Sequence, residues 1–105
     1  MIHIPDITRS LSRLIAAAKP SKIILFGSQA RGNADDRSDV DLLVVCPFEG
    51  SRRKVMSALA LTMEGFGIAV DIIVLSPEEF ELDKHIPGTV ARPAWLEGVL
   101  LYESH

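Results

Sequence analysis

A turn of small residues followed by two closely spaced aspartates constrains this chain more than any other feature. Residues 27–45 have the sequence GSQARGNADDRSDVDLLVV, and the five residues before them, KIILF, are mostly apolar. A second apolar run begins at Asp39 and Asp41. Short apolar runs bounded by turn residues are typical of buried strands. The segment therefore predicts two strands joined by a loop, with acidic side chains where the second strand begins.

The hydrophobic spacing of the rest of the chain predicts an alternation of helices and strands. We expect strands over residues 22–26, 39–46, 69–75 and 99–102. We expect helices over residues 6–18, 29–31, 51–66 and 89–97, and a further helix that begins after Ser76 with a capping box completed by Glu79. This order predicts an α/β (α+β) fold, a small mixed β-sheet with helices packed on it.

The connections between the strands predict where the acidic residues meet. The link between the first two strands is short, which favours an antiparallel pair, whereas the long helix between the second and third strands implies a parallel, right-handed crossover. Asp39 and Asp41 lie at the first and third positions of the second expected strand, and Asp71 lies at the third position of the next. All three acids and the Gly27-Ser28 turn should therefore gather at one end of the sheet.

Three carboxylates in one place repel one another unless a cation lies among them. Alternation along a strand puts Asp39 and Asp41 on the same face. Two Mg²⁺ ions, roughly 3.5–4 Å apart, would turn the repulsion into ligation and would favour phosphoryl or nucleotidyl transfer. Asp39 by itself is equally consistent with a solvated strand terminus. Asp71 lies in an otherwise apolar run and is expected to need a partner.

The turn between the first two strands is suited to binding phosphate. Gly27 lets the backbone approach a ligand closely, and Ser28 offers a hydroxyl at the start of an expected helical turn. Arg31 follows in the same segment. Its side chain could contact phosphate or could form a structural salt bridge across the turn, and the sequence favours neither.

The whole stretch resembles the signature of the DNA polymerase beta-like nucleotidyltransferases, GS-x-x-RG followed by SD-x-D-L. It is similar in particular to the minimal nucleotidyltransferases, the antitoxins of HEPN/MNT toxin–antitoxin pairs. The resemblance covers residues 22–75, and the segment GVLLY at 98–102 is similar to the closing strand of the small members. The second, helical domain of the larger antibiotic-modifying relatives has no counterpart in these 105 residues.

This resemblance implies a role for each residue of the motif. Gly27 and Ser28 would hold the nucleotide triphosphate, Asp39 and Asp41 would ligate Mg²⁺, and Asp71 would help to activate the attacking hydroxyl. It also implies ATP as the substrate and a cognate HEPN toxin as the partner, in a homo- or hetero-oligomer.

Length and composition set further limits. The 105 residues are expected to form a single domain, residues 1–105, in which partners could cover some apolar surface because 48% of the residues are hydrophobic. A net charge of −3 gives no reason to expect strong nucleic-acid binding.

No apolar stretch is long enough to span a membrane, no secretory signal is evident, and the single Cys46 fits a reducing compartment. We therefore expect a cytoplasmic protein. The three histidines lie far apart and are interpreted as surface groups.

Three other segments carry weaker signals. We interpret the basic residues 52–54 and the acidic residues of segment 78–83 as solvated faces rather than partner contacts. Trp95 and Leu96 could belong to the core or to an exposed apolar patch that binds a partner.

The favoured hypothesis is a Mg²⁺-dependent nucleotidyltransferase that transfers AMP from ATP to a hydroxyl, in particular a tyrosine of a HEPN toxin. One alternative is a non-catalytic antitoxin that neutralises its partner by binding alone. Another is an enzyme that modifies a small molecule such as an antibiotic, which the short chain disfavours.

Overall fold

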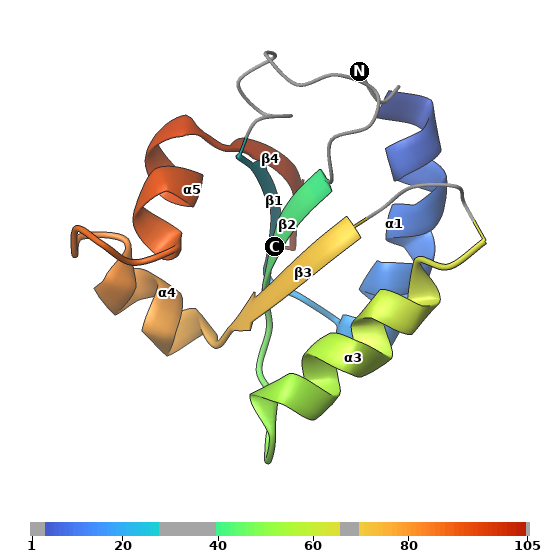
Figure 1. Ribbon diagram of the computed structural model, residues 1–105, viewed down its shortest axis with the longest axis horizontal. Coiled ribbons are helices and arrows are strands. Elements are labelled where there is room, and N and C mark those ends of the chain that lie inside the picture. The colour runs from blue at the N-terminus through green and yellow to red at the C-terminus, as the bar shows by residue number, and fades with distance from the viewer. Residues whose placement is uncertain (1–3, 28–39, 66–69, 105) are drawn as a thin grey trace.

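A four-stranded mixed sheet forms the centre of the molecule (Figure 1). The computed structural model describes residues 4–27, 40–65 and 70–104, and residues 4–9 by their backbone alone. The strands are β1 (Lys22–Phe26), β2 (Val40–Val45), β3 (Val70–Leu75) and β4 (Val99–Glu103), in the spatial order β3-β2-β1-β4. The mixed sheet with helices packed on it confirms the expected fold class.

The pairing of the strands agrees with the expected directions. β1 is antiparallel to β2 and to β4, whereas β2 is parallel to β3. The crossover between the parallel strands contains the helix α3 (Arg52–Thr62), as parallel neighbours require. The C-terminal end of β1 and the N-terminal ends of β2 and β3 therefore lie at the same end of the sheet.

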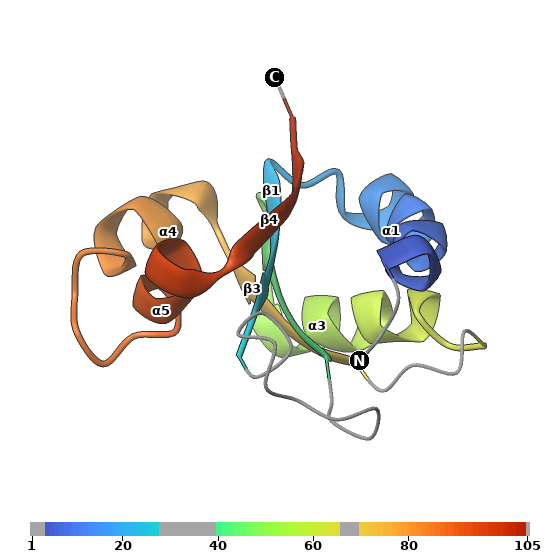
Figure 2. The same cartoon turned by 90° about the horizontal axis from the view of Figure 1, so that it is seen from above.

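Helices cover both faces of the sheet. Figure 2 shows α1 (Ile4–Ala18) and α3 on one side, and α4 (Pro77–Asp83) and α5 (Ala91–Glu97) on the other. Side chains of β2 enter the two cores in turn: Leu42 and Val44 pack with α1 and α3, while Leu43 and Val45 pack with α4 and α5. A strand covered on both faces needs an almost continuous apolar sequence, which explains the run LLVV.

The helix boundaries follow local signals. Lys19 takes a left-handed conformation, with φ 47°, and its N–H donates to Ile15 O, which ends α1 immediately before Pro20. α3 begins at its N-cap Ser51 but ends at Thr62, several residues earlier than expected. α5 contains Pro93 in its first turn, where proline removes no helical hydrogen bond. The expected helical turn at residues 29–31 lies outside the described residues.

The beginnings of α3 and α4 contact each other at the end of the sheet that lies opposite the acidic residues. Ser76 and Glu79 form the expected capping box, in which Ser76 N donates to Glu79 at 3.0 Å and Glu79 N donates to the Ser76 hydroxyl at 3.2 Å. Glu79 also forms an ion pair with Arg52. Both side chains remain in contact with solvent, with exposed fractions of 44% for Arg52 and 35% for Glu79, so the ion pair is compatible with the interpretation of these segments as solvated faces. Tertiary packing brings the two helix N-termini together, and sequence spacing could not show this.

The two apolar residues of α5 whose placement was left open are partly exposed. The exposed fraction is 43% for Trp95 and 57% for Leu96, whereas Ala91 and Ala94 of the same helix are buried against the sheet. The two small residues thus form the core face of this short helix. Trp95 and Leu96 form part of an exposed apolar surface.

The capping box predicts a pH-dependent contribution to stability. The pKa of Glu79 is lowered, first by the hydrogen bond from the Ser76 backbone N–H and then by Arg52. Because the pKa is lower in the folded state, the stabilisation is complete at neutral pH and is lost as the pH falls below about 4.5. We expect Ser76→Ala to lower the free energy of unfolding by about 1 kcal/mol. Glu79→Gln should be destabilising at neutral pH and less destabilising at about pH 3.

Urea denaturation at the two pH values measures both effects. Glu78→Gln is the matched control, because Glu78 is exposed and takes no part in the capping box. An equal loss of stability for Glu79→Gln at both pH values would contradict the prediction.

Candidate active site at the end of the sheet

Three of the sequence-predicted site residues meet at one end of the sheet. Gly27 immediately follows β1, Asp41 is the second residue of β2, and Asp71 is the second residue of β3. Asp41 lies opposite Phe26 across the antiparallel pair and in register with Asp71 across the parallel pair. Neighbouring strands lie about 4.8 Å apart, so the two aspartates start from adjacent backbone positions. The expected convergence is thereby confirmed for these three residues.

The two aspartates occupy the same face of the sheet. Val40 and Leu42, on either side of Asp41, belong to the core under α1 and α3, as do Val70 and Ile72 on either side of Asp71. Because side chains alternate along a strand, both carboxylates lie on the face covered by α4 and α5. The carboxylates of Asp41 and Asp71, both oxygen donors to a metal, thus lie side by side on one face of the sheet.

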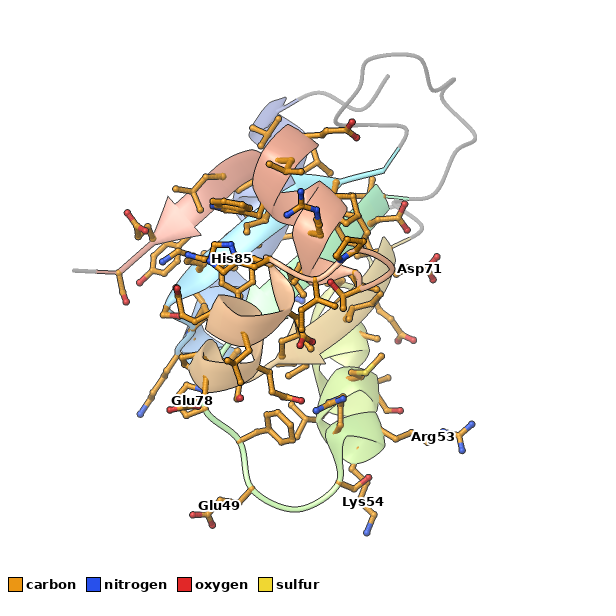
Figure 3. The ribbon with its side chains drawn as sticks, turned by 90° about the vertical axis from the view of Figure 1, so that its left-hand side faces the viewer. Glu49, Arg53, Lys54, Asp71, Glu78 and His85 are labelled. Carbon is orange, nitrogen blue, oxygen red and sulfur yellow. The ribbon has the colours of Figure 1, made fainter. Side chains whose placement is uncertain are left out.

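The two carboxylates differ in their exposure. Asp41 is half-buried and Asp71 is exposed, and Figure 3 shows Asp71 near the margin of the molecule. The sequence argument that Asp71 needs a partner because it lies in an apolar run is therefore wrong. Its neighbours face the core, whereas Asp71 lies on the opposite face near the beginning of an edge strand, where water reaches it.

Gly27 packs directly against the carboxylate of Asp41. A Cβ atom at position 27 would overlap Asp41 Oδ2, and Gly27 has a φ of 78°, a conformation that side chains disfavour. The sequence predicted that this glycine permits a close approach. The structure shows that one of the groups that approach it is Asp41, so the turn and the acidic pair form one unit.

The remaining predicted site residues, Ser28, Arg31 and Asp39, lie outside the described residues. Within the described part of the chain, no group of three or more metal-ligating side chains gathers. Asp41 and Asp71 supply the hard oxygen ligands that Mg²⁺ prefers, and the pair fits one part of such a site. None of the helices in the described ranges is both long and apolar enough to span a bilayer.

The fold and site are thus a mixed sheet with in-register aspartates beside a glycine turn. The nucleotidyltransferase domain family matches residues 5–92 of the chain. The chain belongs to this family and is a nucleotidyltransferase.

Curated relatives come from Methanocaldococcus jannaschii, and both are named as candidate protein adenylyltransferases. One is 36% identical over 81 residues, which are 77% of this chain and 77% of the relative. The other is 42% identical over 65 residues, 57% of this chain but only 44% of that relative.

Solved structures share the fold. A candidate nucleotidyltransferase from Sulfolobus solfataricus superposes with a TM-score of 0.66 at 24% identity, covering 94% of this chain and 78% of that one. A candidate minimal nucleotidyltransferase gives a TM-score of 0.57 at 28% identity and covers 88% of each chain. A toxin–antitoxin with AMP-PNP gives 0.55 at 18% identity, covering 92% of this chain and 73% of that one.

The contact between Gly27 and Asp41 predicts a specific effect of one added methyl group. Gly27→Ala should displace the Asp41 carboxylate and lower the affinity for Mg-ATP roughly tenfold or more, measured by titration calorimetry. Gly50→Ala is the matched control, because Gly50 has a φ of 77° and nothing within 4 Å of an added Cβ. Both variants should lose about 1–2 kcal/mol of stability through backbone strain. Equal affinities in the two variants would show that the turn is merely structural.

Proposed function

We propose that this protein transfers AMP from ATP to a hydroxyl group of another protein, with Mg²⁺ as the cofactor. The acceptor is a tyrosine of a cognate HEPN-type toxin, and the modification silences that toxin, so that the protein acts as an antitoxin. The observation that carries the proposal is the in-register pair Asp41 and Asp71 beside Gly27. The names of the Methanocaldococcus jannaschii relatives support a protein as the acceptor. The likeness to a toxin–antitoxin structure supports only the choice of fold.

In this proposal each residue of the motif has its own role in binding metal or nucleotide. Asp41 is held against the turn and, together with Asp39, would hold Mg²⁺ beside the triphosphate. Bound Mg²⁺ would neutralise phosphate charge and stabilise the negative charge that develops during transfer. Gly27 and Ser28 would contact the triphosphate, and Arg31 is a further phosphate contact in this proposal.

We assign to Asp71 the contact with the incoming hydroxyl. It is exposed, on an edge strand, and adjacent to Asp41, so an acceptor can reach it from solvent. In the proposed step the acceptor oxygen bonds to the α-phosphorus, the bond from that phosphorus to the bridging oxygen breaks, and pyrophosphate leaves. The carboxylate of Asp71 accepts the hydroxyl proton and passes it to water.

The first functional prediction concerns Asp41. Replacing it by asparagine together with Asp39→Asn should reduce transfer to background while the melting temperature holds or rises, because the change removes repulsion between carboxylates. Mg²⁺-dependent release of pyrophosphate and thermal unfolding measure the two effects. Transfer by the double variant at the wild-type rate would refute the catalytic assignment.

The second functional prediction concerns Asp71 and distinguishes the binding of Mg-ATP from the rate of AMP transfer. Asp71→Asn should retain much of the affinity for Mg-ATP but lose roughly 10²–10⁴-fold in transfer rate. Cells that carry this variant and the active toxin should stop growing, although the two proteins still associate. Full protection by Asp71→Asn would favour the alternative in which the domain neutralises its partner by binding alone.

A further inference from the structure

A cavity of about 270 Å³ opens between α5 and β4 on the face of the sheet that carries the two aspartates. Neither Asp41 nor Asp71 lines it. We call this cavity the α5–β4 pocket; the lining residues that matter here are Lys22, Ile24, Phe80, Trp95 and Leu100. Its walls come from two strands and two helices.

Two of the residues that line the pocket, Trp95 and Leu100, are apolar and exposed. Trp95 and Leu100 line it while 43% and 50% exposed, and Leu96, beside Trp95 in the chain, is 57% exposed. Single apolar residues on a surface need no explanation, but a contiguous group beside a cavity marks an interaction site. We estimate the exposed apolar area of these three side chains at roughly 300 Å², comparable to the largest patch on a typical monomer.

Neighbouring side chains contact two of the residues that line the pocket. The rings of His85 and Trp95 meet in a T-shaped arrangement, with 5.2 Å between their centroids, and Lys84 Nζ lies 5.2 Å from the centre of the Trp95 ring. Lys84 also lies over the ring of Phe80 and forms an ion pair with Glu81 at 2.7 Å. These contacts restrict the side chains of Trp95 and Phe80, which lowers the cost of ordering them when a group binds.

The size of the pocket favours a protein side chain over a free small molecule. Sites for drug-sized ligands usually have volumes of about 300–1,000 Å³, so this pocket falls below that range. A mainly apolar pocket of this size accommodates one large aliphatic or aromatic side chain, the usual anchor of a protein interface.

The register of the strands places the pocket close to the catalytic end. Leu100 pairs with Ile24, and Ile24 pairs with Leu43, which lies two residues after Asp41 on β2. Asp71 is in register with Asp41 on the next strand. Three strand spacings across the sheet and two residues along it give a separation of roughly 16 Å between Leu100 and Asp71. A protein chain covers that distance with about five extended residues or about eleven helical residues.

We infer that the α5–β4 pocket docks the protein that carries the acceptor hydroxyl, by receiving one large apolar side chain that the acceptor protein carries roughly 16 Å from the hydroxyl that is modified. This inference rests on the proposed transfer to a protein. It adds the surface that recognises the acceptor and the spacing that the acceptor must satisfy.

The area of the surface favours such an acceptor over a second copy of this chain. Each partner in a stable interface contributes about 800 Å², well over twice the area estimated for these side chains. An acceptor that also enters the catalytic end gains the missing contacts there. A second copy held only by this surface would not gain them.

The test compares Leu100→Glu with two control variants. The first control is Val99→Glu, because Val99 is 45% exposed and pairs with Leu25, whose side chain packs on the opposite face of the sheet. The second is Leu61→Glu, because Leu61 is 64% exposed on α3. The probe is the purified HEPN-type toxin proposed above. Calorimetry measures its binding, kinetics give kcat and KM for AMP transfer, and sedimentation gives the oligomeric state of each variant.

We expect Leu100→Glu to weaken toxin binding at least about 30-fold and to raise KM for the toxin, with kcat and Mg-ATP affinity unchanged. Both controls should bind the toxin as the wild type does. Wild-type affinity of Leu100→Glu, an equal loss in Val99→Glu, or no binding of the toxin by the wild type would overturn the inference. Conversion of a wild-type dimer to a monomer by Leu100→Glu would also overturn it, since the occupant would be a second copy.

One result separates the inference from the proposed function. Suppose that the toxin binds the wild type, that this binding requires Leu100, and that no AMP is transferred. This result would disprove the transfer reaction and would support the docking surface.

Discussion

The parallel pairing of β2 with β3 is the constraint on which the candidate site depends. It sets Asp41 and Asp71 at equivalent positions of adjacent strands, and alternation along both strands places the two carboxylates on one face. A shift of one residue in this register would send one carboxylate into the core under α1 and α3, where an unpaired charge is very costly. The apolar residues on both sides of each aspartate therefore fix the site as firmly as they fix the core.

The packing of Gly27 on Asp41 connects the end of β1 to this pair. Antiparallel pairing brings Phe26 opposite Asp41, and the absence of a side chain at the next residue leaves room for the carboxylate. The position of the turn and the orientation of Asp41 are thus mutually dependent. One residue of the nucleotide motif supports another, in addition to any contact that each makes with substrate.

The two ends of the sheet have different characters. At one end, Arg52 and Glu79 form an ion pair between α3 and α4, and the capping box satisfies backbone and side-chain groups at the beginning of α4. At the other end the acids lie at strand beginnings, with Asp71 exposed to solvent. The short helix α5 covers the sheet with two alanines and leaves larger apolar side chains exposed beside β4. One end of the sheet is thus joined by a cap and an ion pair, and the other presents an acidic side chain to solvent.

Local patterns in the sequence determined the class of fold, the four strands, the capping box of α4 and the convergence of Gly27, Asp41 and Asp71. These features depend on hydrophobic period, turn chemistry and chain connectivity, all of which act over short distances or follow from the order of elements. Only the tertiary structure decided that Asp71 is exposed, that Glu79 pairs with Arg52, and that the side chain of Trp95 borders a pocket. Each of these depends on how elements that are far apart in the sequence pack together, which local spacing does not determine.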